Sequence, residues 1–320
     1  PYSDLYGGAI LNITISLSAH ANIELIEGDE IIIEAYDRKE QQTFPLAKAL
    51  PIDGVLDLAK GVYNRLQKDY PFPPKAMKIS TSVDAPAGSG LGTSSTLVVA
   101  ILGAFVEMLK LPLGDYDIAH YAYDIERNDL RLSGGKQDQY AATFGGVNFM
   151  EFYEDNKVIV NPLRIRTQYL HELENNLLLF YTDTSRESAK IIDEQSKNVH
   201  DKNAASIEAM HKLKEQAQQM KVALLKGKLN EIGTILDYGF QQKRLMASNI
   251  SNSAIEQLYS TAIAAGATGG KISGAGGGGF MIFYCPANTR YQVTEALQKC
   301  SERLREYSFT KLGLQSWTVE

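Results

Sequence analysis

Two carboxylates and a lysine that could serve phosphoryl transfer stand between residues 126 and 138 of this 320-residue sequence. Such a transfer needs a carboxylate that helps to hold a metal, a residue that orients or deprotonates the attacking hydroxyl, and positive charge near the transferred group. Glu126 is the candidate metal carboxylate and Asp138 the candidate base. Lys136 could lower the pKa of Asp138 or hold phosphate. Each of these charges alone could also be a helix cap or a solvated side chain, so the neighbouring motifs decide.

A glycine-rich segment upstream of these residues predicts a triphosphate site. Gly88, Gly90 and Gly92 allow close approach of a ligand and positive φ angles, and hydroxyl residues follow where a helix is predicted to begin. A helix start offers unpaired N–H groups and a partial positive charge that attract anions. No lysine follows the last glycine, as a Walker loop would require, and Thr93 replaces the third glycine of a dinucleotide fingerprint. The predicted nucleotide-binding residues are Pro86, Gly88, Ser89, Gly90, Leu91, Gly92, Thr93, Ser94 and Ser95.

A second glycine-rich segment covers residues 271–279 and contains a formal G-x-G-x-x-G at 274, 276 and 279. A strand is predicted directly after it, whereas the dinucleotide motif must open a helix, so that interpretation is excluded. Four consecutive glycines between two strands predict a backbone that lies very close to a ligand or to the first glycine loop. A flexible hairpin is the alternative.

Hydrophobic periodicity predicts the elements that position these motifs in the first half of the chain. The apolar helix behind the first glycine loop should be buried nearly all round. The strand at 31–36 is expected to be the antiparallel partner of the strand before it. Strands are predicted over 9–26, 31–36, 76–83, 147–153 and 157–160, the last two as a hairpin, and helices over 55–66, 93–109, 115–128 and 136–144.

The second half of the chain changes character, because residues 187–247 are polar with apolar side chains at helical spacing, a pattern typical of helix packing. A capping box at Ser253 and Glu256 predicts the start of a helix. The tail then reads as a β-α-β-β-α-β sandwich, and a domain boundary is expected near residue 165, which gives domains 1–165 and 166–320. The predicted elements are strands over 176–182, 267–272, 280–285 and 314–319 and helices over 253–266 and 289–305.

Composition narrows the class of protein. The chain has 44% hydrophobic residues and a formal net charge of −6, without a Lys/Arg-rich block, which argues against nucleic-acid binding. Cys285 and Cys300 cannot form a disulfide framework and are expected in the core, and the histidines lack metal-ligand spacing. No apolar run is long enough to span a membrane and no signal peptide is recognised, so a cytoplasmic protein is expected.

The order of these motifs, from Pro86–Ser95 through Glu126-Arg127 and Asp138 to Lys271–Gly279, resembles the GHMP kinases, and the similarity covers nearly the whole chain. The resemblance implies an α+β fold in which an N-terminal domain like ribosomal protein S5 domain 2 meets a ferredoxin-like C-terminal domain, with the active site between them. Residues 1–8, 129–140 and 184–188 look most like D-glycero-D-manno-heptose 7-phosphate kinases, which phosphorylate the anomeric hydroxyl of the sugar.

The resemblance also implies roles for individual residues. Ser94 and Glu126 fall where the family holds Mg²⁺, Asp138 on its catalytic aspartate and Gly88–Thr93 on its ATP triphosphate loop. The family's first, sugar-contacting motif lies upstream of Pro1. Arg186, whose planar guanidinium suits anion binding, is expected beside the substrate's own phosphate. The predicted substrate residues are Arg186, Ser188, Gly274, Gly276 and Gly277.

The expected function is therefore ATP- and Mg²⁺-dependent phosphorylation of a small sugar phosphate, and a heptose 7-phosphate is the expected acceptor. Two alternatives stay open: a kinase of another sugar or of a mevalonate-type alcohol, and a catalytically silent sensor that binds sugar and nucleotide. Intact Glu126, Asp138 and hydroxyl groups speak against the sensor, which would not need a base. The oligomeric state and the choice of metal hydroxyl among Thr93, Ser94 and Ser95 stay open.

Overall fold

The computed structural model describes residues 2, 6–182, 188–300 and 304–319, and its contacts divide the chain into two compact units. Unit 1 comprises Pro1–Ile15, Gly88–Leu91 and Gly146–Phe309, and unit 2 comprises Ser16–Ala87, Gly92–Gly145 and Thr310–Glu320. The expected boundary at residue 165 lies inside unit 1, so it does not coincide with these contact units. As a boundary between family domains it stays a prediction.

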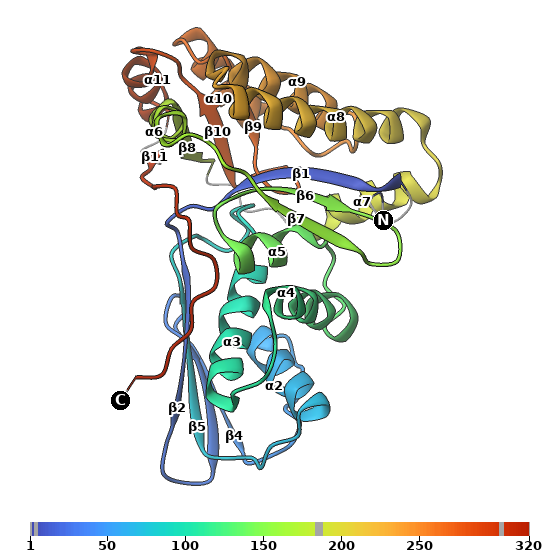
Figure 1. Cartoon of the computed structure of the whole chain (residues 1–320), viewed down its shortest axis with the longest axis vertical. Coiled ribbons are helices and arrows are strands. Elements are labelled where there is room, and N and C mark those ends of the chain that lie inside the picture. Colours follow the sequence, from blue (N-terminus) through green and yellow to red (C-terminus); the bar gives the residue numbers. More distant parts are fainter. Residues whose placement is uncertain (1, 3–5, 183–187, 301–303, 320) are drawn as a thin grey trace. The chain divides into compact units, whose positions relative to one another are not determined.

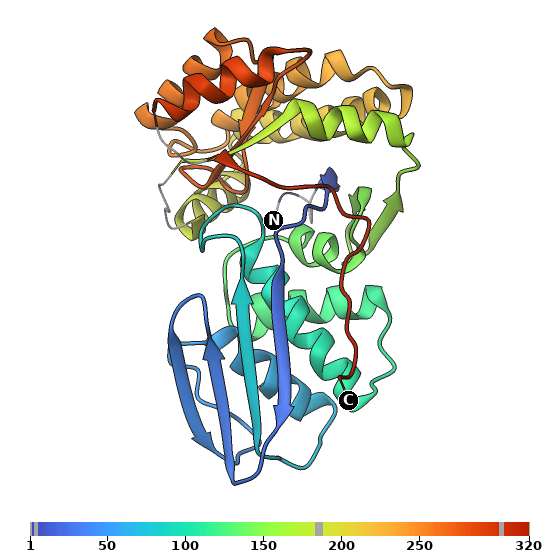
Figure 2. The same cartoon turned by 90° about the vertical axis from the view of Figure 1, so that its left-hand side faces the viewer.

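A four-stranded sheet forms one side of unit 2. Its order is β2-β5-β3-β4, with β5 parallel to β3 and antiparallel to β2 (Figure 2). Ile31, Ile33 and Ile79 are fully buried in the core that this sheet shares with its helices. The strands are β2 (Ala19–Leu25), β3 (Glu30–Ala35), β4 (Glu40–Pro45) and β5 (Met77–Val83).

Two sequence predictions for this sheet are wrong. The expected strand over 9–26 is two strands, β1 (Gly8–Ile13) and β2, which belong to different sheets. The strand at 31–36 does not pair with β2, because β5 inserts between them and β4 takes the other edge. Alternation of apolar residues marks which face of a strand is buried, but it does not specify the partner strand.

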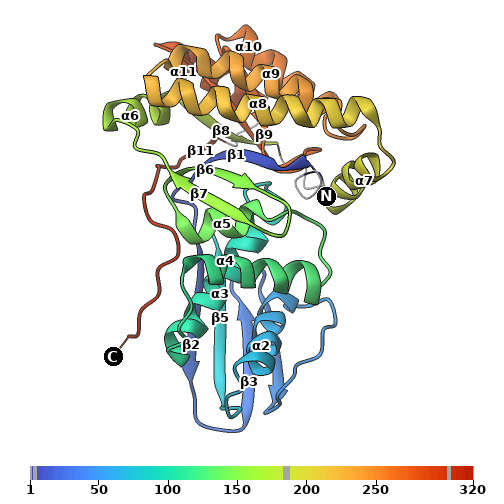
Figure 3. The same ribbon diagram turned by 45° about the vertical axis from the view of Figure 1, so that its right-hand side comes forward.

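Helices α2 (Asp57–Asp69) and α3 (Thr93–Leu109) cover one face of this sheet (Figure 3). The predicted burial of α3 is confirmed, since Val98, Ile101 and Phe105 are fully buried. The irregular C-terminal segment packs on the same helix: a Cβ on Gly103 would lie 2.6 Å from Leu314. The strand predicted at 314–319 is therefore wrong, because this stretch forms no ladder with a neighbour in the described structure.

The helix predicted over 115–128 is α4 (Asp115–Asp124) followed by a π-helical turn, η1 (Ile125–Asp129). The N–H of Leu130 donates to the carbonyl of Ile125 at 2.9 Å, which is the wide i→i+5 bond of a π turn. Ile118 and Ile125 are buried, as the predicted apolar face requires. The π turn carries Glu126, and α5 (Gln137–Phe144) begins shortly after it.

The tail of unit 1 has the ferredoxin-like arrangement that the sequence predicts. Its sheet has the order β11-β8-β10-β9, with every neighbouring pair antiparallel. The order along the chain is strand, helices, strand, strand, helix, strand. The elements are α6 (Thr167–Asn176), β8 (Leu177–Tyr181), α10 (Ser253–Ala264), β9 (Gly269–Ile272), β10 (Phe280–Tyr284), α11 (Thr289–Gln298) and β11 (Leu304–Arg305).

Details of this tail differ from the prediction. The cap of α10 is Asn252, whose side chain accepts the N–H of Ile255 at 3.0 Å, so no capping box begins at Ser253. Helix α11 ends at Gln298, earlier than expected. Cys285 is buried as predicted, whereas Cys300 is exposed.

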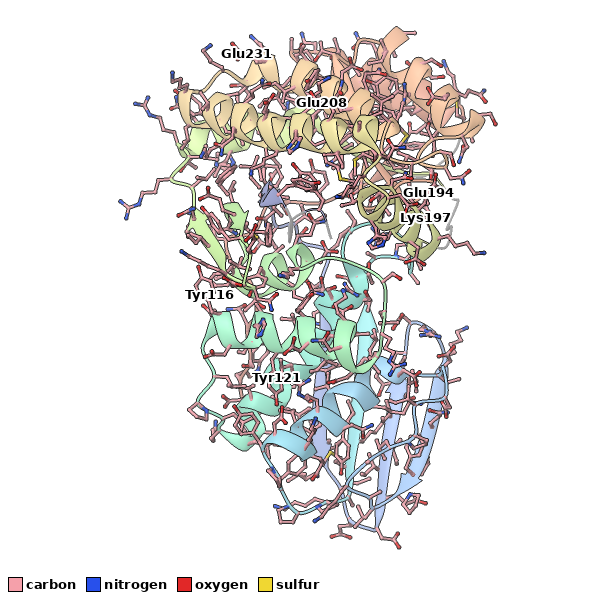
Figure 4. The ribbon with its side chains drawn as sticks, turned by 90° about the vertical axis from the view of Figure 1, so that its right-hand side faces the viewer. Tyr116, Tyr121, Glu194, Lys197, Glu208 and Glu231 are labelled. Carbon is pink, nitrogen blue, oxygen red and sulfur yellow. The ribbon has the colours of Figure 1, made fainter. Side chains whose placement is uncertain are left out.

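Unit 1 also contains a second sheet, β1-β6-β7, in which β6 (Val147–Phe152) and β7 (Val158–Pro162) form the predicted hairpin. Helix α8 (Ala204–Lys226) lies along this sheet and antiparallel to α9 (Ile232–Arg244) (Figure 1). Glu194, on α7 (Ser188–His200; Figure 4), accepts the N–H of Ser248 at 2.9 Å and ties α7 to the segment after α9. None of the helices in the described part of the chain is long and apolar enough to cross a membrane.

Candidate active site

The first glycine loop leads into α3 with the backbone that its glycines predict. Gly88, Gly90 and Gly92 have φ angles of 72°, 76° and 73°, which a side chain would make costly. Gly92 is the N-cap of α3 and supplies no capping side chain. No side chain of the N-cap residue therefore occupies the first-turn N–H groups of α3, which suits a bound anion.

A buried carboxylate, Glu126, contacts the hydroxyl cluster of α3. Ser94 Oγ donates to Glu126 Oε1 at 3.1 Å, and Glu126 is fully buried. Gln139 Nε2 donates to Glu126 Oε2 and, at 3.1 Å, to Ser95 Oγ. Ser94 is thus the hydroxyl beside the carboxylate, while Ser95 is engaged by Gln139.

These donors fit a hard cation. Mg²⁺ prefers oxygen ligands and is commonly held by one or two carboxylates together with substrate phosphates and water. Over the described ranges, no group of three or more His, Cys, Asp or Glu side chains could hold a metal by itself. Glu126 and Ser94 therefore match a metal that is shared with a phosphate ligand, and not an all-protein cage.

Asp138 lies in the first turn of α5 against the start of α3. A Cβ on Gly92 would lie 2.9 Å from Asp138 Cγ, so glycine is required there for this approach. Burial raises the pKa of Asp138 to about 6, and the negative charge of Glu126 adds to the rise. The positive charge of Arg127 opposes this rise in pKa, whereas the sequence predicts Lys136 as the cation that could lower it.

Arg127 and Lys136 have different surroundings. Arg127 donates to the carbonyls of Leu132 and Ser133 at 3.2 and 3.3 Å and so braces the turn before α5. Lys136 is buried, with Nζ 5.5 Å from the ring centroid of Tyr123. No local sequence pattern predicts the hydrogen bonds of Arg127 to this turn or the contact between Gln139 and Glu126, because both depend on tertiary packing.

The two glycine segments contact each other within unit 1, as the sequence predicts. Ser273 Oγ donates to the carbonyl of Gly90 at 2.8 Å, and the N–H of Phe280 donates to the carbonyl of Ser89 at 2.9 Å. A Cβ on Gly274 would lie 2.6 Å from Gly90 Cα. The glycines of the second segment therefore allow two backbones to approach, and the strand that follows excludes a dinucleotide fingerprint.

The predicted substrate residues are placed unevenly. Gly276 and Gly277 are buried, and the N–H of Gly277 donates to the carbonyl of Ile250 at 2.8 Å, whereas Gly274 is exposed. Ser188 begins α7, but the description does not include its side chain. Arg186 lies outside the described residues. Their roles in substrate binding stay predictions.

Replacing Gly90 with Ala should destabilise the contact between the two glycine segments. Alanine at this position would have to keep a φ near 76°, which L residues disfavour, and its Cβ would lie 2.8 Å from the carbonyl oxygen of Ser273. Strain and overpacking together should cost roughly 2–4 kcal/mol. Calorimetry should therefore give a lower Tm than in the wild type, and the affinity for ATP should fall.

Gly54→Ala is the matched control for this substitution. Gly54 also has a positive φ, 92°, but a Cβ there would meet nothing within 4 Å. Only the backbone strain of about 1–2 kcal/mol should appear. Equal Tm values for the two variants would mean that the contact at Gly90 does not stabilise the loop.

Comparison with known proteins places the chain in a family. The GHMP kinases N terminal domain matches residues 57–146 and the GHMP kinases C terminal domain matches residues 220–303. A D-glycero-alpha-D-manno-heptose 7-phosphate kinase of Campylobacter jejuni is 43% identical over 318 residues, which cover 99% of this chain and 93% of that protein.

Two solved structures are similar along nearly the whole chain. A D-glycero-D-manno-heptose 1-phosphate kinase from Bacteroides thetaiotaomicron has a TM-score of 0.85 at 43% identity, covering 100% of this chain and 93% of that one. A putative sugar kinase from Campylobacter jejuni has a TM-score of 0.81 at 43% identity, covering 97% and 90%. With both family domains matched and such identity along almost its full length, the chain belongs to the GHMP kinases and is an ATP-dependent phosphotransferase.

Proposed function

We propose that this kinase transfers the γ-phosphoryl group of ATP to the anomeric hydroxyl of D-glycero-D-manno-heptose 7-phosphate in the cytoplasm. The observation that carries the proposal is the 43% identity, over 99% of the chain, to the Campylobacter jejuni enzyme named for that substrate. The carboxylates and the glycine loop described above supply the chemistry that such a transfer needs.

The first glycine loop, Pro86–Ser95, would bind the triphosphate through backbone N–H groups. The uncapped start of α3 provides N–H donors and a partial positive charge. Ser273 Oγ and the N–H of Phe280 donate to the carbonyls of Gly90 and Ser89, so these two oxygens have partners within the protein. The loop thereby accomplishes with backbone donors what a Walker loop does with the help of a lysine.

Glu126 and Ser94 are our candidates for holding Mg²⁺. When bound, Mg²⁺ would neutralise the negative charge that develops on the phosphate groups during the transfer. Gln139 restricts the Glu126 carboxylate by donating to Oε2, so that Oε1 faces Ser94. Support for this assignment comes from the burial of Glu126 and from the oxygen-only donor set.

Asp138 is our candidate for the general base. It would accept the proton of the anomeric hydroxyl as the sugar oxygen bonds to the γ-phosphorus and the bond to ADP breaks. A pKa of about 6 leaves the carboxylate ionised at neutral pH yet more basic than an ordinary aspartate. We retain Lys136 as a candidate cation near the transferred group and Arg186, Ser188 and the glycines at 274, 276 and 277 as candidates for sugar-phosphate binding.

The pH dependence of kcat should report the ionisation of Asp138. Because the base must be deprotonated and its pKa lies at about 6, kcat should rise with pH through that value and level off above it. Steady-state rates at saturating ATP and sugar phosphate between about pH 5 and 8 would measure this limb. A flat profile over that range would remove Asp138 from the role of base.

A panel of acceptors with ATP tests the substrate assignment. Heptose 7-phosphate, heptose 1-phosphate, the unphosphorylated heptose, galactose and mevalonate should be compared by kcat/KM, and the 7-phosphate should give the highest value. The 1-phosphate is the second candidate, because the Bacteroides thetaiotaomicron structure carries that substrate in its name. Preference for mevalonate or for an unphosphorylated sugar would contradict the proposal, and binding without turnover of any acceptor would favour a sensor.

A further inference from the structure

Two lysines of unit 1 lie beside the contact between the glycine segments. Lys243 is in the last turn of α9, and Lys271 is on β9. Both side chains are partly buried. Lys243 Nζ donates to the carbonyl of Gly274, a residue in close contact with Gly90. One ammonium group is therefore fixed at the edge of the first glycine loop.

Neither lysine has an ion-pair partner among the described residues. No carboxylate of those residues lies within ion-pair distance of Lys243 or Lys271. Arg244, next along the chain, is by contrast paired with Glu256 at 2.8 Å and stacked 4.2 Å from the ring of Phe240. Of these two adjacent cations, Arg244 has a carboxylate partner, whereas Lys243 has none among the described residues.

Electrostatics makes this arrangement costly for the unliganded chain. Burial, and to a smaller extent the charge of Lys271, lowers the pKa of Lys243 to about 7. Burial also lowers the pKa of Lys271. Two like charges that are partly removed from water disfavour each other, and a nearby anion would stabilise both. A divalent anion bound beside the two amino groups would favour the protonated, charged form of both.

We propose that Lys243 and Lys271 form a subsite for a phosphate monoester dianion, an inference that rests on the proposed sugar-phosphate kinase function. The dianion could be the phosphate already on the acceptor sugar or the terminal phosphate of the nucleotide. The acceptor's phosphate is favoured, because the first glycine loop and the start of α3 already provide for the triphosphate, whereas Arg186, the cation that the sequence predicts for the acceptor's phosphate, lies outside the described residues.

A purely structural role explains less. A cation in the last turn of a helix is favoured by the helix dipole, and its bond to Gly274 could serve only to tie α9 to the loop. That tie would need one donor, and a second lysine beside it would weaken it by repulsion. The pair is accounted for by a ligand of opposite charge.

Lys243→Met and Lys271→Met test the subsite, with Lys299→Met as the matched control. Lys299 belongs to the same unit, but its side chain is 75% exposed and 3.8 Å from Glu295. Loss of a charged hydrogen bond should raise the KM of the bound phosphate compound by about 10- to 100-fold. A rise confined to heptose 7-phosphate assigns the acceptor's phosphate, and a rise confined to ATP assigns the nucleotide. Unchanged KM values for both compounds would overturn the subsite.

Two further measurements separate the subsite from the proposed function and from a structural role. In calorimetric titrations, inorganic phosphate should bind the wild type and Lys299→Met but not Lys243→Met or Lys271→Met, whichever sugar the enzyme accepts. Equal binding of phosphate to these four proteins would overturn the proposal. The Met variants should keep or raise the Tm, since they remove repulsion. If the Tm falls and Lys243→Arg does not restore phosphate binding, Lys243 is only a structural tie and the proposal fails.

Discussion

Replacing Asp138 with Asn should lower kcat by about 10²–10⁴-fold, the range in which a positioned general base contributes. The amide keeps the size of the side chain in the first turn of α5, so the approach to Gly92 should be preserved. It cannot accept the proton of the sugar hydroxyl. Steady-state kinetics with heptose 7-phosphate should therefore show the loss in kcat, while calorimetry shows nucleotide binding close to that of the wild type.

Stability distinguishes this outcome from simple unfolding. Because burial and Glu126 raise the pKa of Asp138, the folded chain disfavours the ionised carboxylate. The folded chain therefore loses free energy of unfolding as pH rises through about 6 and Asp138 ionises. An Asn side chain cannot ionise, so the Asn variant should not show this loss. The Tm of the Asn variant at neutral pH should thus equal or exceed that of the wild type. Near-normal turnover in a folded Asn variant would exclude Asp138 as the base.

Replacing Glu126 with Gln should produce the second large effect, a loss of metal affinity. Removing a group that hydrogen-bonds to a metal ligand typically costs about 10- to 100-fold in metal affinity, and removing the charge of the proposed ligand Glu126 should cost at least as much. Gln keeps the side-chain volume and one oxygen for Ser94 but removes the negative charge. Binding of Mn²⁺ in the presence of ATP, followed by electron paramagnetic resonance, measures this without relying on turnover.

Ser94→Ala and Ser95→Ala form the matched pair for the metal assignment. Ser94 contacts Glu126 directly, whereas Ser95 accepts from Gln139. Ser94→Ala should weaken Mn²⁺ binding more than Ser95→Ala does. The metal site would have to be moved elsewhere if Glu126→Gln bound Mn²⁺ as the wild type does, or if Ser95→Ala had the larger effect.

Much of the candidate site could be predicted because its signals are local. Glycines at alternate positions before an apolar helix predict positive φ angles and a helix start, and Gly88, Gly90 and Gly92 have both. Four glycines between two strands predict close backbone contact, which Gly274 and Gly90 make. The ferredoxin-like tail followed from the order of its elements.

What the sequence did not indicate depends on partners distant in the chain. No local pattern reveals that β5 separates β2 from β3, because periodicity identifies a buried face and not a neighbour. The π turn that carries Glu126 has no signature of its own. The tail at 314–319 has strand-forming residues, yet Trp317 is 70% exposed and no strand is beside it in the described structure.

The buried polar contacts could not be predicted from the sequence either, because their partners are brought together only by folding. Only folding brings the amide of Gln139 to Glu126. Lys136, two residues before Asp138, is the cation that the sequence predicts could lower the pKa of Asp138, but the charge that opposes the rise is that of Arg127. Lys243 and Lys271 are almost thirty residues apart, and the packing of α9 on β9 pairs them.

Phosphorus NMR of the product of ATP and D-glycero-D-manno-heptose 7-phosphate tests the central claim most directly. The account predicts a sugar bisphosphate whose new phosphorus resonance is coupled to the anomeric proton, formed in equal amount with ADP. Absence of this product, together with phosphorylation of heptose 1-phosphate or transfer to another carbon of the sugar, would contradict it.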